Sequence, residues 1–136
     1  MKKSSYHLTV RGYELDSFGH VNNAVYLQYA ETALWNFYKV SGVLGELEKE
    51  GLFPVIMESN LRYMHELRLM DEVRIDTEVS CTGGIVSYKH KMINEATGLV
   101  ACKVTGKFVF VNKDRIICDV PEVFRACAEG TDNDDQ

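Results

Sequence analysis

The segment from Asp16 to Asn23 (Asp-Ser-Phe-Gly-His-Val-Asn-Asn) brings a carboxylate and a glycine close to an expected helix start. A carboxylate can act as a general base on water or as a nucleophile toward a carbonyl carbon. The first backbone N–H groups of a helix lack intrahelical partners and carry partial positive charge, so they can stabilise an oxyanion. This combination indicates acyl transfer to water.

Each residue of this segment also has a purely structural interpretation. Asp16 can be a turn or capping residue, and His20 a hydrogen-bonded loop histidine. Asn22 and Asn23 are typical helix-capping residues. Gly19 can admit a close approach of backbone or substrate. From the residues alone, the segment is therefore a candidate site and not an assignment.

A helical pattern follows the segment, from Ala24 to about Val40. Its apolar residues cover well over half of the helix circumference, whereas a surface helix usually has one apolar stripe. We therefore expect a largely enclosed helix that ends at 41–42. Tyr26 is most simply a core tyrosine whose hydroxyl reaches a partner, and Glu31 lies at the edge of the polar stripe.

Most of the remaining chain has the alternation of β-strands. We expect a strand at 6–11, a loop or short helix at 43–51, strands at 53–66, 73–80, 85–94 and 99–111, an edge strand at 115–120 and a short helix at 122–128. One antiparallel sheet must then wrap one long helix, which is an α+β fold. Because a sheet covers only one side of a helix, we also expect a homodimer or homotetramer.

Composition narrows the classes of function. The 136 residues suit one domain at 1–128, followed by an acidic, frayed tail at 129–136. The formal charge of −5 argues against nucleic acid as a partner. No apolar run is long enough to span a membrane, so we expect a cytoplasmic protein. The four cysteines form no CxxC pair, and we expect neither a metal nor another cofactor.

The stretch Arg11–Glu31 resembles the opening of the hotdog-fold acyl-CoA thioesterases, and most closely the 4-hydroxybenzoyl-CoA thioesterase-like group. The shared pattern is Asp-x-x-Gly-His-Val-Asn-Asn-x-x-Tyr, which begins at Asp16 and is followed by the acidic Glu31. A second run at 58–63, with 66–67 and 71–73, resembles the strand after the helix. The resemblance covers residues 5–120 and implies an antiparallel sheet wrapped around a long central helix.

The resemblance also implies roles for individual residues. Asp16 would be the nucleophile or general base toward the thioester, and the backbone N–H of Asn23 the oxyanion donor. Tyr26 and Glu31 match positions that line or support the acyl end. The full set that the resemblance assigns to substrate binding is Gly19, His20, Val21, Asn22, Tyr26, Glu31 and Glu58.

Four functions are compatible with these residues. The first is hydrolysis of an acyl-CoA, and the second is hydrolysis of the same acyl group on an acyl-carrier protein. The second needs a basic surface, for which the possible contributors are Arg62, Arg68, Lys89, Lys91, Lys103 and Lys107. A hotdog dehydratase would need a proline-rich loop that is absent, and the fourth alternative is a non-catalytic acyl-CoA-binding module. The residues leave open whether the acyl pocket is aliphatic or aromatic.

Overall fold

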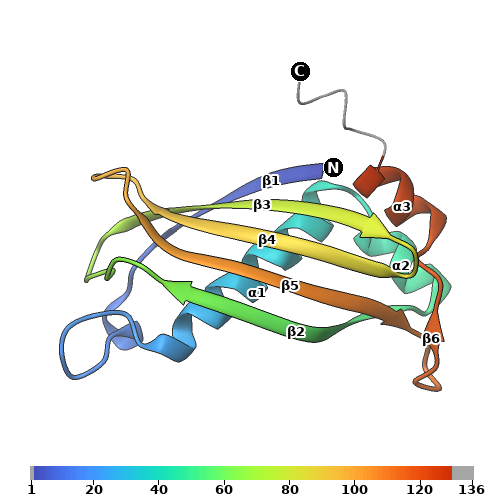
Figure 1. Ribbon diagram of the computed structural model, residues 1–136, viewed down its shortest axis with the longest axis horizontal. Helices are drawn as coiled ribbons and strands as arrows, with labels where there is room; N and C mark the ends of the chain where they lie inside the picture. The colour runs from blue at the N-terminus through green and yellow to red at the C-terminus, as the bar shows by residue number, and fades with distance from the viewer. Residues whose placement is uncertain (1, 130–136) are drawn as a thin grey trace.

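The computed structural model describes residues 2–129 as one antiparallel sheet with a long helix against it (Figure 1). The strand order is β1-β3-β4-β5-β2, and a short β6 pairs with β5. The elements are β1 Lys2–Thr9, a 3-10 turn η1 Gly12–Glu14, α1 Asn23–Val40, α2 Leu44–Glu50, β2 Phe53–Tyr63, β3 Glu72–Thr82, β4 Ile85–Asn94, β5 Val100–Val111, β6 Ile117–Cys118 and α3 Glu122–Glu129. The expected α+β architecture is confirmed, whereas 130–136 of the predicted tail lie outside the described residues.

Several predicted boundaries were wrong. The first strand covers Lys2–Thr9 rather than 6–11, because backbone pairing with β3 extends to Lys2 opposite Val79. The strand predicted at 53–66 ends at Tyr63, where the next two N–H groups both bond to the carbonyl of Ala101. The edge strand predicted at 115–120 shortens to two residues. These boundaries are set by polar residues and backbone hydrogen bonds, so the pattern of apolar residues does not predict them.

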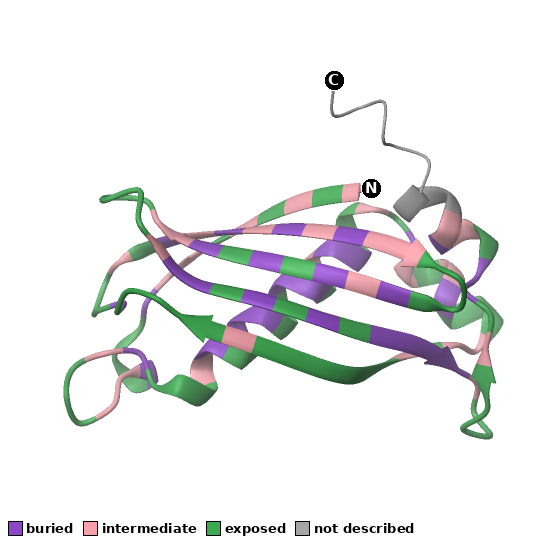
Figure 2. Ribbon diagram, viewed as in Figure 1, coloured by how far each residue is buried: buried purple, intermediate pink, exposed green. Residues whose placement is uncertain are grey.

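Figure 2 shows alternating burial along the inner strands of the sheet. In β3, Val73, Ile75, Thr77 and Val79 are buried, as the alternation predicted. The edge strand β2 differs, because most of its residues are exposed and its pairing with β5 is interrupted between Ile56 and Glu58. The sheet therefore has a well-covered interior between two edge strands, β1 and β2, and β2 is the more exposed of the two.

Helix α1 lies against one face of the sheet and is covered on one side only. Its buried residues are Tyr26, Tyr29, Ala30, Ala33, Leu34, Phe37 and Tyr38. On its other side Leu27 and Trp35 remain 46% and 47% exposed. The expectation of a largely enclosed helix is therefore not met within a single chain. The apolar residues on the side of α1 that faces away from the sheet therefore form an uncovered apolar face.

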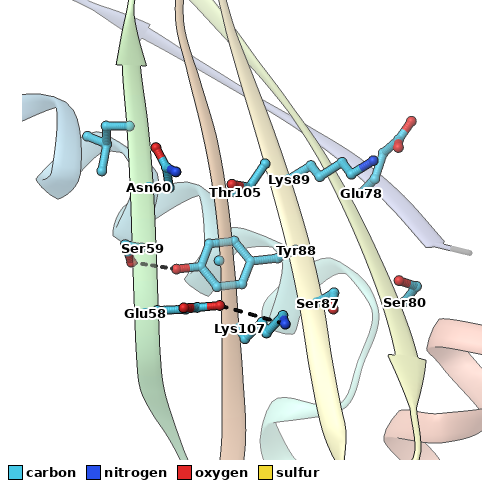
Figure 3. A pocket seen from close by; sticks show the side chains of 12 residues that line it. Glu58, Ser59, Asn60, Glu78, Ser80, Ser87, Tyr88, Lys89, Thr105 and Lys107 are labelled. Atoms are coloured by element: carbon cyan, nitrogen blue, oxygen red, sulfur yellow. Dashed lines mark hydrogen bonds and ion pairs between the residues drawn. The ribbon is translucent and has the colours of Figure 1, made fainter.

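Gly106 in the middle of β5 makes room for a side chain that crosses the strand. A Cβ at this position would lie 2.2 Å from the hydroxyl oxygen of Tyr88. Without it, Tyr88 on β4 reaches over β5, and its hydroxyl lies 2.8 Å from the hydroxyl of Ser59 on β2 (Figure 3). Glycine inside a strand often marks such a close approach.

Candidate active site

Asp16 sits in a tight loop whose backbone closes on itself. Its N–H donates to the carbonyl of His20 (2.7 Å), and its carbonyl accepts from the N–H of Gly19 (3.1 Å). The carboxylate oxygen Oδ1 accepts from the N–H groups of Phe18 (2.9 Å) and His20 (3.2 Å). Within residues 2–129 the other oxygen, Oδ2, has no hydrogen-bond partner. One oxygen thus holds the loop while the other remains available.

Gly19 serves the loop through its backbone conformation. Its φ of +83° lies in the left-handed region that glycine adopts without strain. An added Cβ would meet no heavy atom within 4 Å. The expected close approach of backbone at this glycine is therefore not seen within the chain.

The helix starts with a cap that exposes its first N–H. Asn22 is the N-cap, and its side-chain oxygen accepts from the N–H of Ala24 at 2.9 Å. Asn23 is the first helical residue, one position earlier than predicted. Its N–H has no acceptor in the described part of the chain. The first N–H groups of a helix carry partial positive charge, so this donor suits an anionic oxygen.

The loop and the helix start open on the same shallow depression of about 240 Å³. Of the residues predicted from the sequence, it brings together Asp16, His20, Val21, Asn23 and Tyr26. Its other wall consists of Tyr63, Met64, His65 and Glu66 from the end of β2 and the chain after it. We call this depression the loop pocket.

The side chain of His20 contacts Glu66 and not Asp16, its neighbour in the sequence. Its Nε2 lies 2.8 Å from an oxygen of Glu66, while Asp16 contacts only its backbone. The guanidinium of Arg68 also binds Glu66, and this hydrogen bond lowers the pKa of Glu66. Glu66 was not among the predicted site residues, although it belongs to the second stretch that resembles the family. This arrangement ties the loop to the segment after β2.

Glu14, a buried carboxylate that was not among the predicted site residues, supports the loop through its hydrogen bonds. Glu14 is 5% exposed and accepts hydrogen bonds from the backbone and guanidinium of Arg11 and from the hydroxyl of Tyr29 (2.7 Å). Its backbone carbonyl accepts from the N–H of Asn22. Burial would raise the pKa of Glu14, but the hydrogen bonds from Arg11 and Tyr29 outweigh it and hold this pKa below its usual value.

Tyr26 lines the loop pocket from the first turn of α1. Burial raises the pKa of its hydroxyl to about 12, so the group is a neutral phenol near neutral pH. Its ring meets that of Tyr63 edge-on at 5.2 Å. The Tyr63 hydroxyl in turn donates to the carbonyl of Asn23 at 3.1 Å. The two tyrosines therefore connect the end of β2 to the helix start.

Glu31 and Glu58 lie apart from the loop pocket. Glu31 is at the rim of a second cavity, about 220 Å³, between the uncovered side of α1 and the strands; we call it the acyl-side pocket. It is lined by Leu27, Ala30, Glu31, Leu34, Trp35, Tyr38, Pro54, Ile56, Ser59, Tyr88 and His90. Glu58 lies on the outer face of the sheet, 3.7 Å from Lys107 (Figure 3).

With this geometry established, comparison with known proteins gives the family. A model of the thioesterase-like superfamily matches residues 10–127. The chain belongs to this superfamily. Within residues 2–129, no three His, Cys, Asp or Glu side chains gather as metal ligands would. None of the helices in that range has the length and apolar character that crossing a bilayer requires.

Individual relatives are similar over different lengths. The chain is 28% identical to the long-chain acyl-CoA thioesterase FadM of Escherichia coli over 77% of its own length and 80% of that protein. It is 34% identical to the chloroplastic acyl-acyl carrier protein thioesterase ATL3 of Arabidopsis thaliana over 60% of its own length. The matched region covers only 43% of that relative. The solved structure of a DHNA-CoA thioesterase from Staphylococcus aureus has a TM-score of 0.86 at 18% identity, with 100% of this chain and 97% of that one covered. This likeness shows the hotdog fold.

The Glu14 network gives the first testable prediction. Because the pKa of Glu14 is lower in the folded chain than in the unfolded one, its carboxylate adds stability above the unfolded value of about 4.3 and loses that contribution as the pH falls through the folded value. Glu14→Gln should lower the free energy of unfolding near neutral pH by about 2 kcal/mol and flatten its decline below about pH 4. Denaturant titrations across this range measure both effects.

The matched control is Glu50→Gln, because Glu50 is exposed at the end of α2. It should leave the pH dependence of unfolding as in the wild type. If the free energy of unfolding of Glu14→Gln declined below about pH 4 as steeply as that of the wild type, this carboxylate would not support the loop.

Proposed function

We propose that this protein hydrolyses acyl-CoA thioesters at the loop pocket, with Asp16 and the N–H of Asn23 as the catalytic groups. The observation that carries the proposal is their shared position. Asp16 Oδ2 and the Asn23 N–H both lack partners within the described chain, and their residues line one pocket. A free carboxylate oxygen beside a free helix N-terminal donor matches the needs of an acyl-transfer transition state.

In this mechanism the thioester carbonyl oxygen accepts a hydrogen bond from the Asn23 N–H. Asp16 removes a proton from a water molecule, and the resulting hydroxide adds to the carbonyl carbon. The helix N-terminus stabilises the oxyanion of the tetrahedral intermediate. Collapse of the intermediate breaks the carbon–sulfur bond, and the thiolate of CoA takes the proton back from Asp16. A direct attack by Asp16 would use the same two groups, with water cleaving the anhydride in a second step.

The other predicted residues of the loop position these two groups. Gly19 and Asn22 set the turn and the helix start, and His20 anchors the loop to Glu66. Tyr26 and Val21 form the inner wall of the loop pocket. From this wall the acyl chain runs along the uncovered side of α1 into the acyl-side pocket, where Glu31 marks the rim.

Asp16→Asn tests the catalytic role with little disturbance of the loop. The asparagine oxygen can still accept from Phe18 and His20, but the amide cannot take a proton from water. We expect kcat for a panel of acyl-CoA thioesters to fall by roughly 100- to 10,000-fold while the melting temperature stays near that of the wild type.

Asp119→Asn is the matched control, because Asp119 is exposed between β6 and α3. Full activity in Asp16→Asn would remove this residue from the mechanism. Tight acyl-CoA binding without hydrolysis by the wild type would favour the non-catalytic binding module.

We further propose a dimer in which a second copy covers the β2 edge of the sheet and the uncovered face of α1. Strand β2 ends the sheet, so its outer backbone groups can pair with another strand. Ile56 on β2 is 46% exposed and lines one pocket with Leu27 and Trp35. Met57, the next residue at the interruption of the β2–β5 pairing, is 55% exposed. A two-fold pairing of β2 with its copy buries these side chains together and encloses the acyl-side pocket.

Met57→Lys places a charge at the centre of the proposed interface. Sedimentation should give about twice the mass of one chain for the wild type and a shift toward the single-chain mass for the variant, with thioesterase activity falling in parallel. Leu99→Lys is the control, since Leu99 is an exposed apolar residue at the β4–β5 turn. A wild type that remains monomeric at high concentration would contradict the dimer.

One surface favours the acyl-carrier alternative as a second function. Arg62, Lys103 and Lys91 face each other in register across β2, β5 and β4 on the outer side of the sheet. Like charges placed directly opposite are destabilising, and none of the three has an ion-pair partner among residues 2–129. A cationic row on a chain of net charge −5 suits the acidic surface of a carrier protein.

The double substitution Lys91→Gln and Lys103→Gln tests this row. If the row docks a carrier protein, kcat/KM for an acyl-carrier thioester should fall roughly tenfold at low salt, with a smaller change for the same acyl group on CoA. The control double variant, Lys39→Gln with Lys113→Gln, removes two exposed charges elsewhere. Equal loss for both thioesters would assign the row to CoA instead.

A further inference from the structure

Two residues that line the acyl-side pocket each carry a buried polar atom without a hydrogen-bond partner. Tyr38 is 1% exposed and His90 is 2% exposed, yet the Tyr38 hydroxyl and the His90 Nε2 form no hydrogen bond. In residues 2–129 only one other buried side-chain atom, the hydroxyl of Ser4, shares this property. Because buried polar groups are almost always hydrogen-bonded, two such atoms at one cavity need an explanation.

The structure holds both side chains in place. His90 on β4 uses Nδ1 to contact the hydroxyl of Thr77 at 2.8 Å, which leaves Nε2 as its only free ring nitrogen. Burial lowers the pKa of His90 to about 4, so the ring is neutral near neutral pH. Tyr38 packs edge-on against Trp35 and Phe108, and burial raises the pKa of its hydroxyl, which therefore remains a donor.

Two further oxygens border the same cavity. The hydroxyls of Tyr88 and Ser59 pair at 2.8 Å across Gly106, and both residues line the pocket. The ring of Tyr88 lies 5.2 Å from that of His90. A polar cluster therefore stands within a pocket whose remaining walls are mostly apolar, such as Leu34 and Ile56. An apolar pocket with a few convergent polar groups is typical of a ligand site.

The cluster lies far from the proposed reaction centre. Asn23 and Glu31 are eight residues apart in α1, or about 12 Å along the helix axis, and Tyr38 lies about two turns further. A group held by Tyr38 and His90 would therefore be well down the acyl chain and not beside the thioester. A linear chain along α1 can span this separation.

We propose that the acyl-side pocket selects thioesters whose aliphatic chain carries a neutral oxygen, a hydroxyl or a ketone, in its distal half. The Tyr38 hydroxyl donates to this oxygen, and His90 Nε2 supplies the second hydrogen bond when the ligand group is a hydroxyl. The inference rests on the proposed thioesterase function and deepens it by naming the substrate class.

Glu31 decides against a charged group at the same position. It stands exposed at the rim of the acyl-side pocket, close enough to Tyr38 for its charge to favour the neutral phenol. A carboxylate at the far end of the acyl chain would meet this like charge. The chemistry of the pocket thus favours a hydroxy- or keto-acyl chain over a dicarboxylic one.

The test compares hexadecanoyl-CoA, whose chain is long enough to approach Tyr38, with its hydroxyl isomers at the ω, mid-chain and β positions and with the ω-carboxy analogue. We expect kcat/KM for the ω or the mid-chain hydroxyl isomer to exceed that for hexadecanoyl-CoA by roughly tenfold. The β-hydroxy isomer should gain nothing, and the ω-carboxy analogue should be the poorest substrate. Equal values across the panel would overturn the inference while leaving the thioesterase function intact.

Tyr38→Phe then tests the polar contact. The ratio of kcat/KM between the preferred hydroxyl isomer and hexadecanoyl-CoA should fall toward one. The melting temperature should not fall, because the lost hydroxyl has no hydrogen-bond partner among the described residues. Tyr6→Phe, on β1 outside the pocket, should leave the ratio as in the wild type. A preference that survives Tyr38→Phe, or a large loss of stability in that variant, would contradict the proposal.

A binding measurement separates this inference from the proposed function. If the wild type hydrolyses no member of the panel, calorimetric dissociation constants for the same thioesters replace the rates. A tenfold tighter binding of the hydroxyl isomer, lost in Tyr38→Phe, would support the pocket assignment even though the thioesterase function had failed. Equal dissociation constants would overturn the assignment.

Discussion

The candidate site depends on the hydrogen bonds of the buried Glu14 carboxylate. It receives hydrogen bonds from Arg11 and Tyr29, and its backbone carbonyl receives the N–H of the helix cap Asn22. These bonds fix where α1 begins relative to the loop that carries Asp16. Since a buried charge is costly unless it is fully hydrogen-bonded, the chain cannot move the loop without exposing or orphaning Glu14. The unpaired Asn23 N–H is thus held at the loop pocket.

One-sided coverage of α1 links the fold to the proposed binding of the acyl chain. The sheet buries one side of the helix, and the other side, with Leu27 and Trp35, becomes the wall of the acyl-side pocket. The helix therefore carries the proposed reaction centre at its first turn and the proposed acyl path along its length. Closure of this path by a second copy would make dimer formation a condition of activity rather than an addition to it.

Those parts of the candidate site that are local in the chain could be predicted from the sequence. Asp16, the glycine turn and the capped helix start follow one another within eight residues, and the alternation of β3 predicted its buried face. Contacts between distant segments left no such pattern. In the sequence Glu14 looks like an ordinary loop carboxylate, because its burial and its hydrogen bond from Tyr29 depend on the packing of α1. Glu66 lies beside His20 only because the end of β2 packs next to the loop. The presence of both Tyr38 and His90 at one pocket likewise depends on how the sheet packs against the helix.

A crystal structure of Asp16→Asn with a bound acyl-CoA would test the central claim most directly. The account predicts that the thioester carbonyl oxygen lies about 3 Å from the backbone nitrogen of Asn23, with the substituted side chain beside the carbonyl carbon and the acyl chain following α1. A thioester bound elsewhere, for example on the outer face of the sheet near Lys107 and Glu58, would contradict it.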